Sequence, residues 1–152
     1  FCIVGHSERR QIFQEIDKDI NLKSERLIAN NVIPIICIGE TLEQKEKGIT
    51  NTVLEEQLMN SIPSSSTFEN TIIAYEPVWA IGTGLTPTID EIDETHRFIR
   101  SHNDKFNKYK ILYGGSVKAS NAKEITHLAN VDGALIGGAS LKSDEFTKII
   151  QD

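Results

Sequence analysis

Short apolar runs alternate with helical patterns along the chain, and this alternation constrains the fold more than any other feature. The runs lie near residues 1–4, 33–38, 71–75, 110–113 and 134–136. Strands that alternate with helices in this way are typical of successive βα units, whose strands lie parallel in one sheet. We therefore predict an α/β protein, and no composition shift divides residues 1–152 into separate domains.

The stretches between these runs carry apolar residues at the spacing of a helix face. The first contains Ile12, Phe13, Ile16, Ile20, Leu27 and Ile28, and the second contains Val53, Leu54, Leu58 and Ile62 before Pro63 ends it. Thr88 and Glu91 form a capping-box pattern before a third helix, where we expect His96 to be a surface or packing residue and not a ligand. Ser120 and Ser143 are placed to open the last two helices.

The composition excludes several classes of partner. The chain has 152 residues, with 16 Lys and Arg against 22 Asp and Glu, and its net charge of -6 argues against nucleic acid and anionic membranes. Cys2 and Cys37 lie in apolar strand-like runs, as expected of reduced thiols. No apolar run approaches membrane-spanning length and no signal peptide precedes the first strand, so we predict a cytoplasmic protein.

A carboxylate lies at the carboxyl end of the third predicted strand. Glu76 follows an apolar run and precedes Pro77, which cannot donate to a strand ladder. A buried carboxylate is costly unless it is used or paired, so Glu76 is either catalytic or a salt-bridged structural residue. Trp79 then lies between Pro77 and the Gly-Thr-Gly of 82–84, a pattern typical of a lid with two hinges.

The first strand and the last two also end in residues that suit a site. His6 follows the first strand, and amides of the helical turn begun by Ser7 would keep its ring neutral, although a lone His is more often structural. Gly114–Gly115 and Gly137–Gly138 let backbone amides approach an anion, and barrels often bind phosphate there. The alternative, that these glycines only form tight turns, is weaker for both pairs together. The glycines of 82–84 lack the third glycine of a dinucleotide fingerprint.

Five ordered blocks resemble the triosephosphate isomerase family: VGHSERR at 4–10, CIGE at 37–40, AYEPVWAIGTG at 74–84, YGGSV at 113–117 and GGASL at 137–141. The resemblance implies a (β/α)8 TIM barrel, of which this chain supplies about the last five βα units as a single incomplete domain, 1–152. The family's Asn-x-Lys element, whose lysine binds the phosphorylated substrate, and its dimerisation loop have no counterpart here. We therefore expect the isolated chain to be unstable or self-associating.

The resemblance also implies an activity. The family interconverts dihydroxyacetone phosphate and D-glyceraldehyde 3-phosphate through an enediolate, in glycolysis and gluconeogenesis, as a homodimer and without metal or organic cofactor. Carried over residue by residue, Glu76 is the base and His6 is the electrophile. The substrate phosphate is expected on the backbone amides of Gly82, Ser116, Gly137 and Gly138.

Further residues take supporting roles by the same resemblance. Ser7 is expected to bond the resting base, Glu8 and Arg10 to support the floor of the site, and Cys37 to pack beside the base. Glu40 is expected to hold Trp79 when the lid is open. The family's counterpart of Tyr113 bonds a lid amide at the position of Pro87, which has no such donor.

Two alternatives remain at this point. The chain could be a catalytically inactive truncated half-barrel that retains the anion-binding loops. It could also be another phosphate-binding barrel enzyme, which is less favoured because such enzymes share the glycine loops but not His6 together with the lid after Glu76.

Overall fold

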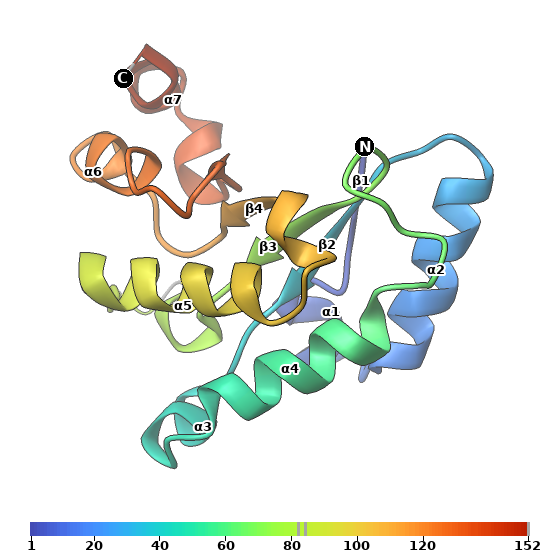
Figure 1. Cartoon of the computed structure of the whole chain (residues 1–152). Coiled ribbons are helices and arrows are strands. Elements are labelled where there is room, and N and C mark those ends of the chain that lie inside the picture. Colours follow the sequence, from blue (N-terminus) through green and yellow to red (C-terminus); the bar gives the residue numbers. More distant parts are fainter. Residues whose placement is uncertain (82, 84, 152) are drawn as a thin grey trace.

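The computed structural model describes residues 1–81, 83 and 85–151, which form a parallel five-stranded sheet with helices packed along it (Figure 1). The strands are β1 (Cys2–Val4), β2 (Pro34–Ile38), β3 (Ile72–Tyr75), β4 (Lys110–Tyr113) and β5 (Gly133–Ala134). The α-helices are α1 (Ser7–Ile12), α2 (Asp17–Ala29), α3 (Leu42–Glu46), α4 (Thr50–Ser61), α5 (Ile89–Ser101), α6 (Ala122–Thr126) and α7 (Ser143–Gln151). Short 3₁₀ turns are η1 (Val78–Ala80), η2 (Phe106–Lys108) and η3 (Gly138–Leu141).

The strands pair in chain order, from β1 to β5, and every pair is parallel. This arrangement confirms the predicted α/β sheet and brings the carboxyl ends of all five strands to the same edge. The last strand is shorter than the predicted 134–136. Its pairing ends when the amide of Leu135 donates to the carbonyl of Tyr113 at 2.8 Å, because β4 itself ends at Tyr113.

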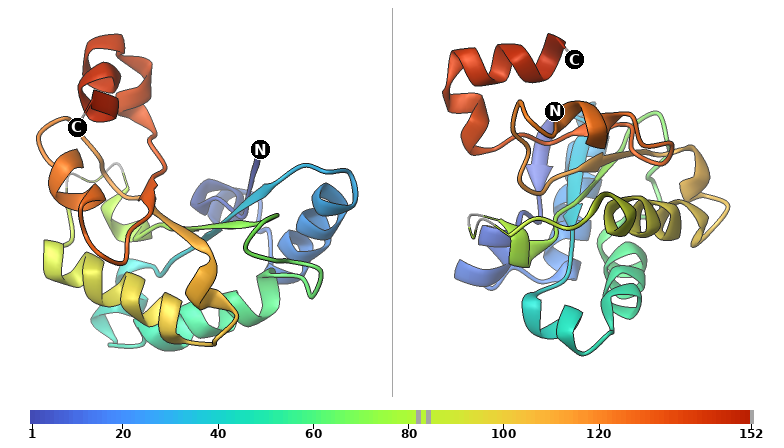
Figure 2. Two further views of the ribbon diagram at one scale, coloured as in Figure 1. Left: turned by 45° about the horizontal axis from the view of Figure 1, so that its top comes forward. Right: turned by 90° about the vertical axis from the view of Figure 1, so that its left-hand side faces the viewer.

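The core lies between the sheet and the helices that follow one another around it (Figure 2). Ile36, Ile73 and Ile111, one from each of the three central strands, are completely buried. From the helices, α4 contributes Leu54 and Leu58, and α5 contributes Ile92 and Ile99. Burying such side chains supplies most of the free energy that holds the units together, about 1.5–3 kcal/mol for each one. The predicted apolar faces of these two helices are thereby confirmed.

The first predicted helix is wrong in one respect, because it is two helices. The break falls between α1 and α2, where Gln14 has a left-handed φ of 54°. A helical face cannot continue through such a residue. Ile12, Phe13 and Ile16 are consequently more than half exposed, whereas Ile20, beyond the break, is buried.

Three smaller expectations also need comment. Ser120 does not cap the sixth helix, since α6 begins at Ala122 after Asn121, whose side chain instead bonds the amide of Lys118 at 2.8 Å. The capping box of Thr88 and Glu91 is confirmed at the start of α5. His96 is a packing residue and not a surface one, because it is fully buried between the rings of Tyr75 and Tyr113.

The two outer strands each have one neighbour. In and before β1, Phe1 and Ile3 are exposed, and a hollow of about 540 Å³ beside this strand is lined by residues of β1 and α2. The sheet is therefore open on the side of β1, as an incomplete barrel requires.

The part of the chain that the structure describes contains no helix long and apolar enough to cross a lipid bilayer.

Candidate active site

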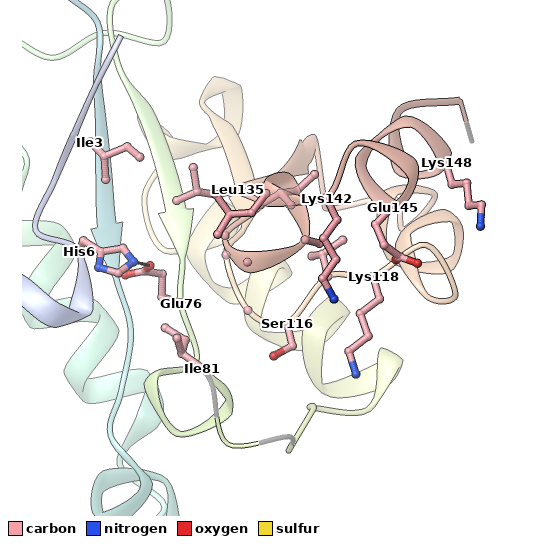
Figure 3. Close-up of a pocket in the computed structure, with 18 of the residues that line it drawn as sticks. Ile3, His6, Glu76, Ile81, Ser116, Lys118, Leu135, Lys142, Glu145 and Lys148 are labelled. Atoms are coloured by element: carbon pink, nitrogen blue, oxygen red, sulfur yellow. Dashed lines mark ion pairs between the residues drawn. The ribbon is translucent and has the colours of Figure 1, made fainter.

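The carboxyl ends of β1 and β3 place a histidine and a glutamate in contact. His6 is the second residue after β1, and Glu76 follows β3 directly, its amide donating to the carbonyl of Ile38 at 2.8 Å. His6 Nε2 lies 3.0 Å from Glu76 Oε1, and the amide of Ser7 donates to Glu76 Oε2 at 3.1 Å. Figure 3 shows the pair at one side of a cleft. The structure thus brings together His6, Ser7 and Glu76 as the sequence suggested.

The hydrogen bonds of His6 define its tautomer. The amide of Glu8 donates to Nδ1 at 3.3 Å, so Nδ1 is the acceptor nitrogen. Nε2 then carries the ring proton and donates it to the carboxylate of Glu76. A neutral imidazole whose N–H lies at the wall of a cleft is able to polarise a carbonyl that binds there.

Glu76 is buried, with 2% of its surface exposed, and burial raises its pKa. The contacts with His6 and with the amide of Ser7 oppose that rise. A carboxylate that is partly desolvated in this way is a stronger proton acceptor than one in water. Cys37 lies beside it, fully buried, and its own pKa is raised by burial and then by the charge of Glu76. A thiol held neutral packs and does not attack.

Two glycines are required by the closeness of Glu76. A Cβ on Gly39 would overlap the backbone carbonyl of Glu76, and one on Gly114 would lie 2.9 Å from Glu76 Cγ. Gly39 was not singled out from the sequence, and Gly114 was read there as part of an anion-binding loop. Packing therefore explains both of these glycines. By contrast, a Cβ on Gly137 or Gly138 would meet no atom within 4 Å, which leaves room for a ligand.

Arg10 joins the elements beneath the pair. Its guanidinium donates to the carbonyls of Gly5 and Cys37, at 2.9 and 3.1 Å, and to Asp17 at 2.6 Å. It therefore fixes the ends of β1 and β2 against the start of α2. Glu8 differs from expectation in that its backbone amide holds His6 while its side chain is exposed.

The segment after Glu76 is held on its outer side by Glu40. Trp79 Nε1 donates to Glu40 Oε1 at 2.7 Å, and the hydroxyl of Tyr75 donates to the same carboxylate at 3.2 Å. Glu40 is 1% exposed, and burial raises its pKa while these donors oppose the rise. The expected contact of Glu40 with Trp79 is therefore present.

Three further residues were expected near the lid or the phosphate, namely Ser116, Tyr113 and Gly82, and the structure describes the first two. Ser116 Oγ donates to the carbonyl of Ala80 at 2.9 Å, so Ser116 contacts the segment after Glu76. Tyr113 is buried, burial raises its pKa to about 12, and its hydroxyl has no partner in the part of the chain that the structure describes. Gly82 lies outside the described residues.

A cleft of about 1130 Å³ opens at the edge of the sheet where the carboxyl ends of the strands lie (Figure 3). His6, Glu76 and Ile81 line one side, and the loops at 114–118 and 135–139 line the other. Lys118, Lys142 and Lys148 also line it. The sequence analysis missed these lysines because they belong to no chemical motif and only the fold gathers them. Among the described residues, no three His, Cys, Asp or Glu side chains are grouped as metal ligands.

Comparisons with known proteins agree on one family. A sequence model described as triosephosphate isomerase matches residues 1–152. Among similar proteins, the triosephosphate isomerase of Rhizobium meliloti is 53% identical over 152 residues, covering 97% of this chain and 59% of the relative. That of Mesomycoplasma hyorhinis is 47% identical over 150 residues, covering 99% and 60%.

A solved structure extends the agreement to the fold. The crystal structure of triosephosphate isomerase from Bartonella henselae has a TM-score of 0.89 and 44% identity, over 98% of this chain and 62% of that one. The chain therefore spans about three fifths of the length of the relatives it matches.

Proposed function

We propose, because this chain belongs to the triosephosphate isomerase family, that its site interconverts dihydroxyacetone phosphate and D-glyceraldehyde 3-phosphate. The contact of 3.0 Å between Glu76 and the N–H of His6 carries this proposal. A base and a hydrogen-bond donor that share one point of a cleft suit proton transfer next to a carbonyl. An inactive half-barrel is less favoured, since relatives at about half identity are named as isomerases.

In the proposed reaction, Glu76 takes a proton from the carbon next to the substrate carbonyl. The electron pair of the broken C–H bond forms the enediolate double bond, and the carbonyl oxygen becomes negative. The Nε2–H of His6 stabilises that oxygen. Return of the proton from Glu76 to the neighbouring carbon, with a proton moving between the two oxygens, completes the isomerisation.

The substrate phosphate is placed on the opposite side of the cleft. Within the described residues, the amides of Gly137 and Gly138 donate to no other group, and open space lies in front of both glycines. Lys118 and Lys142 line the same side and add positive charge. We place the phosphate on the amides of Ser116, Gly137 and Gly138, with that of Gly82 as a further donor.

Residues 77–84 are proposed to close over the enediolate and exclude water, so that the intermediate does not lose phosphate. We further propose a homodimer in the cytoplasm. The exposed side chains of Ile12, Phe13 and Ile16, next to the site on α1 and the loop after it, support a protein contact there.

A completed barrel, in which the amino-terminal segment of the Rhizobium meliloti relative is joined to this chain, provides the test. Turnover of dihydroxyacetone phosphate should appear in this protein, and Glu76→Asp should reduce it by about 1000-fold because the carboxylate moves by about 1 Å from the carbon it deprotonates. Affinity for inorganic phosphate should be unchanged. Glu55→Asp, on the exposed side of α4, is the matched control. Near-normal turnover of the Glu76→Asp variant would remove Glu76 from the mechanism.

A further inference from the structure

A lysine outside the site contacts the indole of Trp79. The Lys45 ammonium lies 3.6 Å from the centroid of the Trp79 ring, and its Nζ also bonds Glu91 Oε1 at 2.9 Å. The ring is therefore held at two places, by Glu40 on its N–H and by Lys45 on its face. A cation over an indole face is attracted by the ring quadrupole, most strongly for tryptophan.

Two elements fix the position of Lys45. It lies on α3, whose N-terminus is fixed by a capping box. Thr41 Oγ1 accepts from the amide of Gln44, and the side chain of Gln44 accepts from the amide of Thr41. Its partner Glu91 belongs to the capping box of α5. The bond from Lys45 lowers the pKa of Glu91, because the ammonium favours the charged carboxylate. Lys45 thus connects α3 to α5 across Trp79.

A small cavity lies between Trp79 of the proposed lid and Pro87, which follows the lid. Glu40, Lys45, Trp79, Pro87 and Glu91 all line a space of about 230 Å³. On its other side this segment reaches the cleft, because Ile81 lies two residues after Trp79 and lines the cleft with Glu76 (Figure 3). A change in how Trp79 is held is therefore transmitted to the cleft over a few residues.

We propose that Lys45 is a positioning residue of the lid, whose ammonium holds the Trp79 indole on Glu40. The proposal rests on the proposed function, in which residues 77–84 close over the substrate. Removing the ammonium should therefore lower the population of the conformation with the bonded indole by about two- to fivefold relative to the alternative.

Trp79 is the single tryptophan of the chain, so 5-fluorotryptophan incorporated there would report on it by ¹⁹F NMR. In the completed barrel, the tryptophans of the added segment are first replaced by phenylalanine. Lys45→Met should shift the ¹⁹F population away from the bonded indole by two- to fivefold. Lys45→Arg should restore it, because a guanidinium keeps the charge and stacks on the ring. Glu91→Gln should shift it in the same direction but less, since Lys45 then loses its anchor but not its charge.

Lys47→Met is the matched control, because it removes the same charge from the residue that ends α3, and Lys47 pairs with exposed Glu43 away from Trp79. An identical ¹⁹F population in Lys45→Met and Lys47→Met would overturn the proposal. If Lys45→Met fails to fold, Glu91→Gln decides: no population shift in that variant overturns the proposal, and a shift supports it.

Kinetics separate a positioning role from a structural one. If Lys45 acts through the lid, Lys45→Met should change KM and kcat together, because the lid governs both substrate binding and product release. An unchanged KM with a reduced kcat would contradict this role. Absence of turnover in the unsubstituted completed barrel would count against the proposed function instead, and the ¹⁹F comparison would still test the contact of Lys45.

Discussion

The two sides of the cleft are built by opposite means. On the side of β1 and β3, nearly every polar atom of the site has a protein partner: His6 is bonded at both nitrogens and Glu76 at both oxygens. On the side of β4 and β5, Gly137 and Gly138 face open space, and Lys118, Lys142 and Lys148 line the cleft. The comparison teaches that the proposed reacting groups are preorganised by the chain, whereas the side proposed for the phosphate keeps its amides free of protein partners among the described residues.

The largest effect should come from separating this chain from the rest of a barrel. Residues 1–152 alone leave the edge of β1 unpaired and provide no counterpart of the family's substrate-binding lysine. We expect turnover at least about 1000-fold below that of the completed barrel. Light scattering should show particles larger than a compact monomer. A monodisperse monomer with ordinary turnover would contradict this prediction.

The contrast between the two sides predicts unequal effects of adding one methyl group. Gly39→Ala should displace the backbone of Glu76 and reduce turnover by about 100-fold, with a lower melting temperature. Gly138→Ala should leave the melting temperature unchanged and raise KM, because its Cβ enters only the space in front of the amides. Equal thermal stability of the two variants would show that the first side is less tightly packed than described.

The burial of His96 predicts that the folded protein loses stability as the pH falls below 6.5. Burial lowers the pKa of His96 to about 4 from an ordinary value of 6.5. The unfolded chain therefore takes up a proton below pH 6.5 that the folded chain refuses until about pH 4. Stability that is present above pH 6.5 is lost as the pH falls through that window, by about 3 kcal/mol in all.

Urea unfolding between pH 7 and pH 4 would measure this loss. Glu76 and Glu40, whose pKa values are raised, act in the opposite sense, so the contribution of His96 is the difference between the completed barrel and its His96→Phe variant. The variant should show a flatter pH dependence. His127→Gln, at an exposed position, is the control, and a variant curve parallel to the wild type would refute the assignment.

The smallest expected effects come from removing the hydroxyls of Ser116 and Tyr113, which lie near the lid. Ser116→Ala removes the bond to the carbonyl of Ala80 and should change turnover by about fivefold, the value of one hydrogen bond. Tyr113→Phe removes a hydroxyl without a partner in the described residues, and Pro87 offers it no amide, so turnover should change less than twofold. A larger loss for the tyrosine variant would show that Tyr113 contributes more to the lid than Ser116 does.

Much of the site could be predicted because its chemistry lies directly after strands. Apolar runs define where parallel strands end, and His6 and Glu76 lie at those ends. The break at Gln14 could not be predicted, because nothing in its local sequence demands a positive φ. Lys45 was also missed, since its contact with Trp79 depends on the packing of α3, a helix too short to show a clear period.

The parallel order of the strands has a consequence for the time course of folding. Ser7 and Glu76, which share a hydrogen bond, are 69 residues apart, and β2 lies between their strands. The pair therefore cannot form until β1 has docked on β2 and β2 on β3, and closing so long a loop is slow. We expect the bond between them to be among the last native contacts to appear. A substitution in β2 that retards docking would thus delay the appearance of activity during refolding while the finished geometry stayed the same.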